Sequence, residues 1–135
     1  MKNKLLSIQI KKMRSVAKKS SRHAHSPYSK ACVGAACLTS SGKIFGGCNI
    51  ENSSFGGTTC AEQVAIFKAA SEGEREITAI YVYTSGGWPP CGICRQIISE
   101  FASSDCKVII GNADGEETIK DFFEEILPMA FTPQH

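Results

Sequence analysis

The spacing of apolar residues along the chain predicts where its first helices and strands lie. Residues 3–20 carry apolar side chains, Met13 and Ala17 among them, at helical intervals with basic residues between them, which predicts an amphipathic helix. The short apolar runs 31–38 and 43–50 are separated by a polar turn and are typical of a hairpin of buried strands.

After the hairpin, the pattern alternates between helix and strand. The predicted helices cover residues 60–71, 91–101 and 118–127, and the predicted strands cover residues 78–84 and 107–110. Helix, hairpin and then alternating elements describe an α/β fold, an α-β-α sandwich around a mixed sheet. No internal repeat or low-complexity segment interrupts it, and a chain of 135 residues is expected to form a single domain over residues 1–135.

Two short motifs place cysteines at the predicted starts of helices. They are Cys60-Ala61-Glu62 and Pro90-Cys91-Gly92-Ile93-Cys94. A helix N-terminus offers free N–H groups and partial positive charge, which favour thiolates. Three thiolates would leave a fourth zinc position for water, as in catalytic sites. Glu62, two residues from Cys60, should diverge from it around the helix and lie beside that open position as a general acid and base.

Two other interpretations of these motifs are open at the level of the residues. A closed structural zinc site would need a fourth ligand, for which His23, His25 or another Cys could serve, although the chain has no second CxxC motif and no His pair of zinc-finger type. A redox CxxC would require neither Cys60 nor Glu62.

Composition and charge narrow the class of protein. Apolar residues make up 42% and charged residues 21%, as in soluble globular proteins, and no apolar run approaches membrane-spanning length. The odd cysteine count of seven does not indicate a disulfide framework and favours a reducing, cytoplasmic location. Four cysteines outside the motifs are expected to be small core residues: Cys32, Cys37, Cys48 and Cys106.

The basic residues are unevenly distributed. Nine Lys and Arg residues fall within residues 1–30, before the first acid, Glu51. Such an arm could bind RNA, in an RNA-binding module with a structural zinc. No aromatic residue interleaves the basic residues of positions 2–22 to stack bases, which favours a solvated helix face and argues against nucleic acid as a partner.

The order of short motifs resembles the cytidine deaminase family, in its small, three-cysteine, homotetrameric form. The motifs span positions 26 to 131 and comprise Ser26-Pro27-Tyr28-Ser29, Val33-Gly34-Ala35-Ala36, Asn49-Ile50-Glu51-Asn52, the two cysteine motifs with Arg95-Gln96, and Leu127-Pro128 followed by Phe131. The resemblance implies a roughly five-stranded central sheet and a homotetramer with shared active sites. It also implies a zinc-dependent hydrolase that deaminates cytidine and 2′-deoxycytidine in pyrimidine salvage.

The resemblance also implies roles for individual residues. Cys60, Cys91 and Cys94 would bind zinc, Glu62 would be catalytic, Asn49 and Glu51 would hold the ribose hydroxyls, the backbone at Ala61 would contact the base carbonyl, and Phe131 would pack on the base from a neighbouring subunit. From the residues alone, Asn49 could equally be a strand-end turn residue and Glu51 a solvated acid.

Three positions depart from the family pattern. Ala31 stands where Phe is usual, Phe55 where Tyr is usual, and Gln63 where three-cysteine members have an Arg that offsets thiolate charge. Arg95 is expected to help compensate for that missing charge. Blasticidin-type deaminases also depart in this region, and Gly56-Gly57 is faintly similar to theirs, so a modified cytosine nucleoside such as blasticidin S is the alternative substrate.

Overall fold

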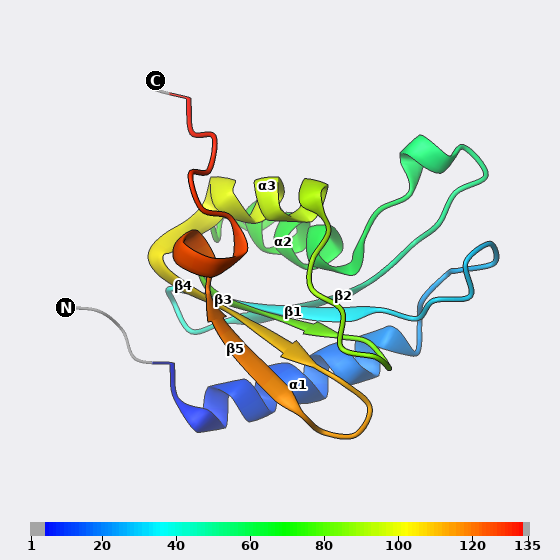
Figure 1. Ribbon diagram of the computed structural model, residues 1–135, viewed down its shortest axis with the longest axis horizontal. Helices are drawn as coiled ribbons and strands as arrows, with labels where there is room; N and C mark the ends of the chain where they lie inside the picture. Colours follow the sequence, from blue (N-terminus) through cyan, green and yellow to red (C-terminus); the bar gives the residue numbers. More distant parts are fainter. Residues whose placement is uncertain (1–4, 134–135) are drawn as a thin grey trace.

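The computed structural model describes residues 5–133 of the chain, which form a sheet with helices on both faces (Figure 1). The five strands lie in the order β2-β1-β3-β4-β5. Their bounds are β1 Gly34–Thr39, β2 Ile44–Cys48, β3 Ile77–Tyr83, β4 Ala102–Gly111 and β5 Glu117–Asp121. β3 and β4 are parallel and the other neighbouring pairs are antiparallel, so the predicted mixed five-stranded α/β sandwich is confirmed.

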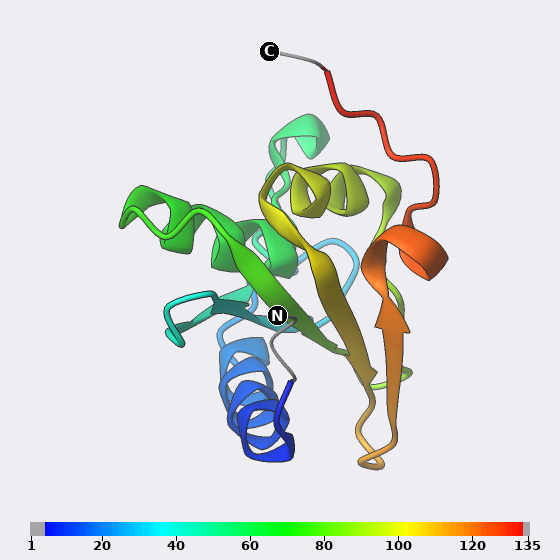
Figure 2. The same ribbon diagram turned by 90° about the vertical axis from the view of Figure 1, so that its left-hand side faces the viewer.

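Helix α1, Ser7–Ser21, covers one face of the sheet by itself (Figure 2). Its fully buried residues Met13 and Ala17 pack on β1, β3 and β4, which confirms the amphipathic helix predicted from the spacing. The helix lies very close to the first strand: a Cβ added to Gly34 would lie 1.8 Å from the carbonyl oxygen of Ala17. The start of the predicted helix, at residues 3 and 4, lies outside the described residues.

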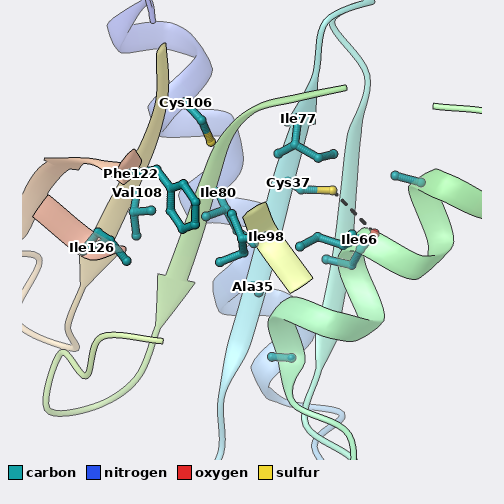
Figure 3. Close-up of a cluster of buried hydrophobic side chains, with 13 residues drawn as sticks. Ala35, Cys37, Ile66, Ile77, Ile80, Ile98, Cys106, Val108, Phe122 and Ile126 are labelled. Atoms are coloured by element: carbon teal, nitrogen blue, oxygen red, sulfur yellow. Dashed lines mark hydrogen bonds between the residues drawn. The ribbon is translucent and has the colours of Figure 1, made fainter. Parts of the chain in front are cut away.

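Helices α2, Ala61–Ser71, and α3, Gly92–Phe101, cover the opposite face (Figure 1). Figure 3 shows the core between these helices and the sheet, where Ile66, Ile80 and Ile98 meet with no exposed surface. Cys37 belongs to this core and its thiol donates a hydrogen bond to the carbonyl oxygen of Ala65 at 3.5 Å. This core holds α2 and α3, and so both cysteine motifs, against one sheet.

The predicted core role of the four remaining cysteines is confirmed for two of them. Cys37 and Cys106 are buried, and burial raises the pKa of both thiols to about 12. Cys48 is half-buried at the end of β2. For Cys32 the prediction is wrong, because its residue precedes β1 and is exposed.

The predicted helix over 118–127 is wrong in its first half. The structure has strand β5 there, followed by one turn of π-helix over Phe122–Ile126. A turn at Asn112–Gly115, with Gly115 at φ +89°, returns the chain alongside β4, and pairing with the open edge of that strand satisfies the backbone of Glu117–Asp121. This strand is the fifth member of the sheet.

Candidate active site

Three cysteine sulfurs meet where helices α2 and α3 begin. Cys60 is the N-cap residue of α2, Cys91 is the N-cap residue of α3, and Cys94 lies in the first turn of α3. The Sγ atoms of Cys60 and Cys91 are 3.9 Å apart, those of Cys91 and Cys94 are 3.4 Å apart, and all three lie within 4.8 Å of one another. We call this group the thiol cluster.

The thiol cluster fits a zinc ion. A tetrahedral ion with Zn–S bonds of about 2.3 Å would hold its sulfurs roughly 3.8 Å apart, close to the separations seen. Among residues 5–133, the group of potential ligands close enough to share one ion has three members, so a closed four-ligand site does not form there. The two helix N-termini that converge on the sulfurs supply positive potential for a cluster of thiolates.

Hydrogen bonding within the thiol cluster shifts the pKa values of two of its thiols in opposite directions. A hydrogen bond from the Cys94 thiol lowers the pKa of Cys60 to about 7 and raises the pKa of Cys94 itself. The side-chain amide of Gln63 donates to the Cys94 sulfur at 3.4 Å from a nearly buried position. Gln63 therefore supplies a neutral hydrogen-bond donor where the family pattern has a cation.

Arg95 does not contact the thiol cluster in the way we expected. Its guanidinium donates to two backbone carbonyls, through Nε to Pro90 and through Nη1 to Ile126, each at 2.8 Å. These two hydrogen bonds connect the loop before Cys91 with the C-terminal segment. The sulfurs are not among the hydrogen-bond partners of Arg95, so compensation of their charge by Arg95 would act at a distance, and it stays a prediction.

Glu62 lies in the first turn of α2 and is 4% exposed. Desolvation of its carboxylate by burial raises its pKa, against weaker opposing contributions from hydrogen bonds. It is not a member of the thiol cluster, yet both line one cavity, so the carboxylate lies beside the sulfurs without belonging to the metal-binding group. A buried carboxylate with a raised pKa is suited to taking up and giving back protons near neutral pH.

The cavity in front of Glu62 has a volume of about 230 Å³, and we call it the catalytic cavity. It is somewhat smaller than typical ligand sites of about 300–1,000 Å³, as suits a small substrate. It is lined by Val33, Asn49, Glu51, Thr58, Cys60, Ala61, Glu62, Val82, Thr84, Trp88, Pro89 and Cys91. The structure thus brings together seven of the eight site residues predicted from the sequence, since Cys94 belongs to the thiol cluster at its wall.

Asn49 holds the backbone of residues 31–33 at the catalytic cavity through hydrogen bonds of its side-chain oxygen and nitrogen. Its Oδ1 accepts from the backbone N–H of Val33 at 2.9 Å, and its Nδ2 donates to the carbonyl of Ala31 at 2.8 Å. An amide can make up to four hydrogen bonds, so Asn49 retains one donor and one acceptor site for a ligand. It directly follows Cys48, the last residue of β2.

Glu51 is held by the loop that precedes β1. Its carboxylate accepts from the backbone N–H groups of Tyr28 at 2.9 Å and Ser29 at 3.2 Å, and from the Ser29 hydroxyl. The Ser29 hydroxyl bond is the main reason why the pKa of Glu51 is lowered. An ionised carboxylate offers about four acceptor sites, so one is left for a substrate hydroxyl.

Ala61 and Phe131 differ in how far they are exposed to solvent. Ala61 is fully buried as the first residue of α2 and lines the catalytic cavity. Phe131 is 71% exposed on the C-terminal tail, which runs past α3 in Figure 1, and it is not among the residues that line the catalytic cavity of its own chain. The tail is anchored by the Gln96 side chain, which donates to the carbonyl of Phe131 at 3.1 Å.

Six residues that line the catalytic cavity were not predicted as site residues from the sequence, Thr84 and Trp88 among them. The Thr84 hydroxyl accepts from the backbone N–H groups of Gly87 and Trp88, each at 2.8 Å, which shapes the loop ahead of the second cysteine motif. Trp88 is 54% exposed and forms part of the wall. A lone tryptophan three residues before Cys91 is a signal that could have been used.

The fold and the thiol cluster together define an α/β protein with a three-thiol zinc centre that opens into a small cavity. The sequence model of the family described as "Cytidine and deoxycytidylate deaminase zinc-binding region" matches residues 7–111. The chain belongs to this family, whose cofactor is zinc.

Individual relatives agree over most of the chain. A cytidine deaminase of Halalkalibacterium halodurans is 47% identical over 82% of this chain and 85% of its own, and that of Sporosarcina psychrophila is 43% identical over 94% of each. The crystal structure of cytidine deaminase from Burkholderia pseudomallei superposes with a TM-score of 0.84 at 38% identity, over 90% of this chain and 98% of that one. A blasticidin-S deaminase of Bacillus cereus is a more distant relative, at 34% identity over 74% of this chain and 76% of its own.

Among the described residues, the structure contains no helix long and apolar enough to cross a membrane.

Proposed function

We propose that this protein hydrolytically deaminates cytidine and 2′-deoxycytidine to uridine and 2′-deoxyuridine with release of ammonia, a step of pyrimidine salvage. The observation that carries the proposal is a buried carboxylate, Glu62, that lines the same small cavity as the thiols of Cys60 and Cys91. Membership of the deaminase family supports it.

The proposed chemistry assigns both proton transfers to Glu62. Zinc, when bound by Cys60, Cys91 and Cys94, supplies an acidified water. Glu62 takes the proton of the attacking water and delivers it to the ring nitrogen of cytosine, which makes C4 electrophilic. It then carries the second proton of that water to the amino group, which leaves as ammonia. Because one carboxylate acts first as base and then as acid, a pKa raised by burial suits both steps.

We assign substrate orientation to other residues that line the catalytic cavity. We expect Glu51 and Asn49 to use their remaining hydrogen-bonding capacity on the sugar hydroxyls, and the backbone at Ala61 to contact the base carbonyl. The support for this is their shared position on the cavity wall and the rigid hydrogen bonding of both side chains. Rigid polar groups lose little entropy when a ligand binds.

We further propose that residues 1–135 act as one domain and assemble into a homotetramer with shared sites. Phe131, Met129 and Ile93 are large apolar side chains that are more than two thirds exposed on α3 and the C-terminal tail. Contiguous exposed apolar groups mark interaction surfaces, and the proposal expects these three side chains to share one. In this assembly Phe131 would complete the catalytic cavity of a neighbour. The free thiols of the described residues support a cytoplasmic location.

The proposal is tested with the zinc-loaded protein and four compounds: cytidine, 2′-deoxycytidine, cytosine and blasticidin S. Deamination is followed by ultraviolet absorbance and by release of ammonia. We expect turnover of the two nucleosides, with free cytosine poor because it lacks the sugar. The alternative is a modified cytosine nucleoside such as blasticidin S, which the blasticidin-S deaminase relative favours, and a preference for that compound over cytidine would support it.

A further inference from the structure

Trp88 is the one tryptophan of the chain and lies on the loop that joins β3 to α3 (Figure 1). It lines the catalytic cavity, and it also lines a second cavity of about 390 Å³. Its side chain therefore lies between two open spaces, where it borders a ligand that fills the catalytic cavity.

Packing of the protein core does not account for Trp88. The residue is 54% exposed, and it belongs to neither of the two hydrophobic clusters on the faces of the sheet. Among residues 5–133, the two aromatic pairs involve other rings. A large apolar ring in this position would gain buried surface when a ligand covers it.

The loop holds Trp88 in place before a ligand arrives. The buried hydroxyl of Thr84 accepts hydrogen bonds from the backbone N–H groups of Gly87 and Trp88, each at 2.8 Å. Gly87 has φ +76°, a left-handed conformation that suits glycine. A Cβ added to Gly86 would lie 3.1 Å from the indole Nε1, so the ring lies against the backbone of Gly86. A wall set in advance costs little entropy when a ligand binds.

The same loop carries a member of the thiol cluster. Pro89 and Cys91 line the catalytic cavity together with Trp88. In the proposed reaction, C4 of cytosine lies beside the thiol cluster, because the attacking water is activated there. Trp88 is the one aromatic side chain among the described residues that line the catalytic cavity. Nucleic-acid bases are flat and stack on aromatic side chains, so this indole is suited to contact the base.

We infer that Trp88 is a substrate-positioning residue, whose indole packs against the cytosine base and helps to hold C4 beside the thiol cluster and Glu62. This rests on the proposed function and adds an aromatic contact from the chain's own loop to the one proposed for Phe131 of a neighbour. The contact is made by a ring and uses neither a charge nor a hydrogen bond. Another aromatic residue should therefore replace Trp88, and a small residue should not.

The first experiment compares the steady-state kinetics of zinc-loaded wild type, Trp88→Ala and Trp88→Phe with cytidine and 2′-deoxycytidine. Trp88→Ala should raise KM by about tenfold or more and change kcat by less than about threefold, because a binding contact is lost while Glu62 is unchanged. The factor should be the same for both nucleosides, which share the base. Trp88→Phe should keep KM within about threefold of the wild type, since it restores a ring.

Two controls separate this role from a structural one. Phe67→Ala removes a ring of similar exposure, 47%, from α2 at a position that does not line the catalytic cavity, and it should alter neither kcat nor KM. Chemical denaturation followed by circular dichroism should give the same midpoint for Trp88→Ala and the wild type, because Trp88 is outside the hydrophobic clusters.

Fluorescence gives a second readout, because the emission of a single tryptophan reports on position 88 alone. Uridine, the product, is not consumed, and its titration into the wild type should change the emission with a midpoint equal to its inhibition constant. The inference is overturned if cytidine is deaminated but Trp88→Ala leaves KM unchanged, or if saturating uridine leaves the emission unchanged. If the wild type does not deaminate cytidine, the proposed function fails instead.

Discussion

At the scale of single residues, we expect a change at Glu62 to affect the chemical step and not binding. Glu62→Gln keeps the size and burial of the side chain but cannot shuttle protons, so we expect turnover of cytidine to fall by at least about 10³-fold. Zinc content and the affinity for the product uridine should change little, since Glu62 is not part of the thiol cluster. Metal analysis and competition by uridine check both. Glu72→Gln, at the exposed C-cap of α2, is the control, and near-normal turnover in the Glu62 variant would refute the mechanism.

We expect Gln63 to influence how firmly the thiol cluster retains zinc. Its amide donates to the Cys94 sulfur, so Gln63→Met, which removes the donor at similar size, should lower zinc affinity by about 10–100-fold. Gln63→Arg replaces this neutral donor with a charged one that offsets the thiolates, and it should be tolerated or mildly activating. Transfer of zinc to a chromogenic chelator measures the affinity directly. Equal zinc release from the wild type and the Met variant would show that this hydrogen bond is dispensable.

Residues of the site could be predicted from sequence where local spacing determines their position. Cys91 and Cys94 are one helical turn apart and Cys60 caps its own helix, so each motif builds its part of the site from neighbouring residues. Arg95 shows the limit. Its partner, the carbonyl of Ile126, is 31 residues away and depends on where the C-terminal segment returns, which no local pattern contains.

At the scale of elements, the contact between α2 and β2 positions the first cysteine motif. A Cβ added to Gly47 would lie 2.6 Å from the backbone nitrogen of Ala65 and 2.7 Å from the carbonyl oxygen of Ala61. Gly47→Ala must therefore push α2 away from the sheet, and we expect a loss of about 1–3 kcal/mol of stability together with weaker zinc binding. Chemical denaturation and zinc titration measure the two effects. Gly56→Ala has open space around it and should leave both unchanged, and a Gly47 variant that behaves likewise would contradict the close packing.

The elements that sequence predicted well are those whose own apolar pattern matches their burial. Helix α1 is an example, since Met13 and Ala17 face the sheet at helical spacing. The error at 118–127 arose because Ile119 and Ile126 also fit a helical period, while β5 is an edge strand with mostly exposed residues and so lacks an alternating pattern. Pairing with β4, a tertiary interaction, decided the conformation.

At the scale of the whole molecule, the position of Phe131 makes shared sites testable by mixing two variants. If Phe131 completes the catalytic cavity of a neighbour, Phe131→Ala should lower kcat/KM for cytidine by about tenfold or more, since a buried aromatic contact would be lost. Assemblies that contain both Phe131→Ala and Glu62→Gln chains then include complete sites. In these sites the Phe131→Ala chain supplies the intact Glu62 and the Glu62→Gln chain supplies the intact Phe131. Random assembly gives about a quarter of such sites in an equal mixture.

We therefore expect the mixture, after unfolding and joint refolding with zinc, to recover activity above the sum of the two separate variants. The control pair is Glu62→Gln with Cys60→Ala. Both of these residues line the catalytic cavity of their own chain, so every hybrid site lacks one of them and no recovery can occur. Recovery in the first pair and none in the second would require that Phe131 acts across an interface. Absence of recovery in both, in an assembly that sedimentation shows to be mixed, would mean that the exposed tail of each chain folds back on its own site or does not take part in it.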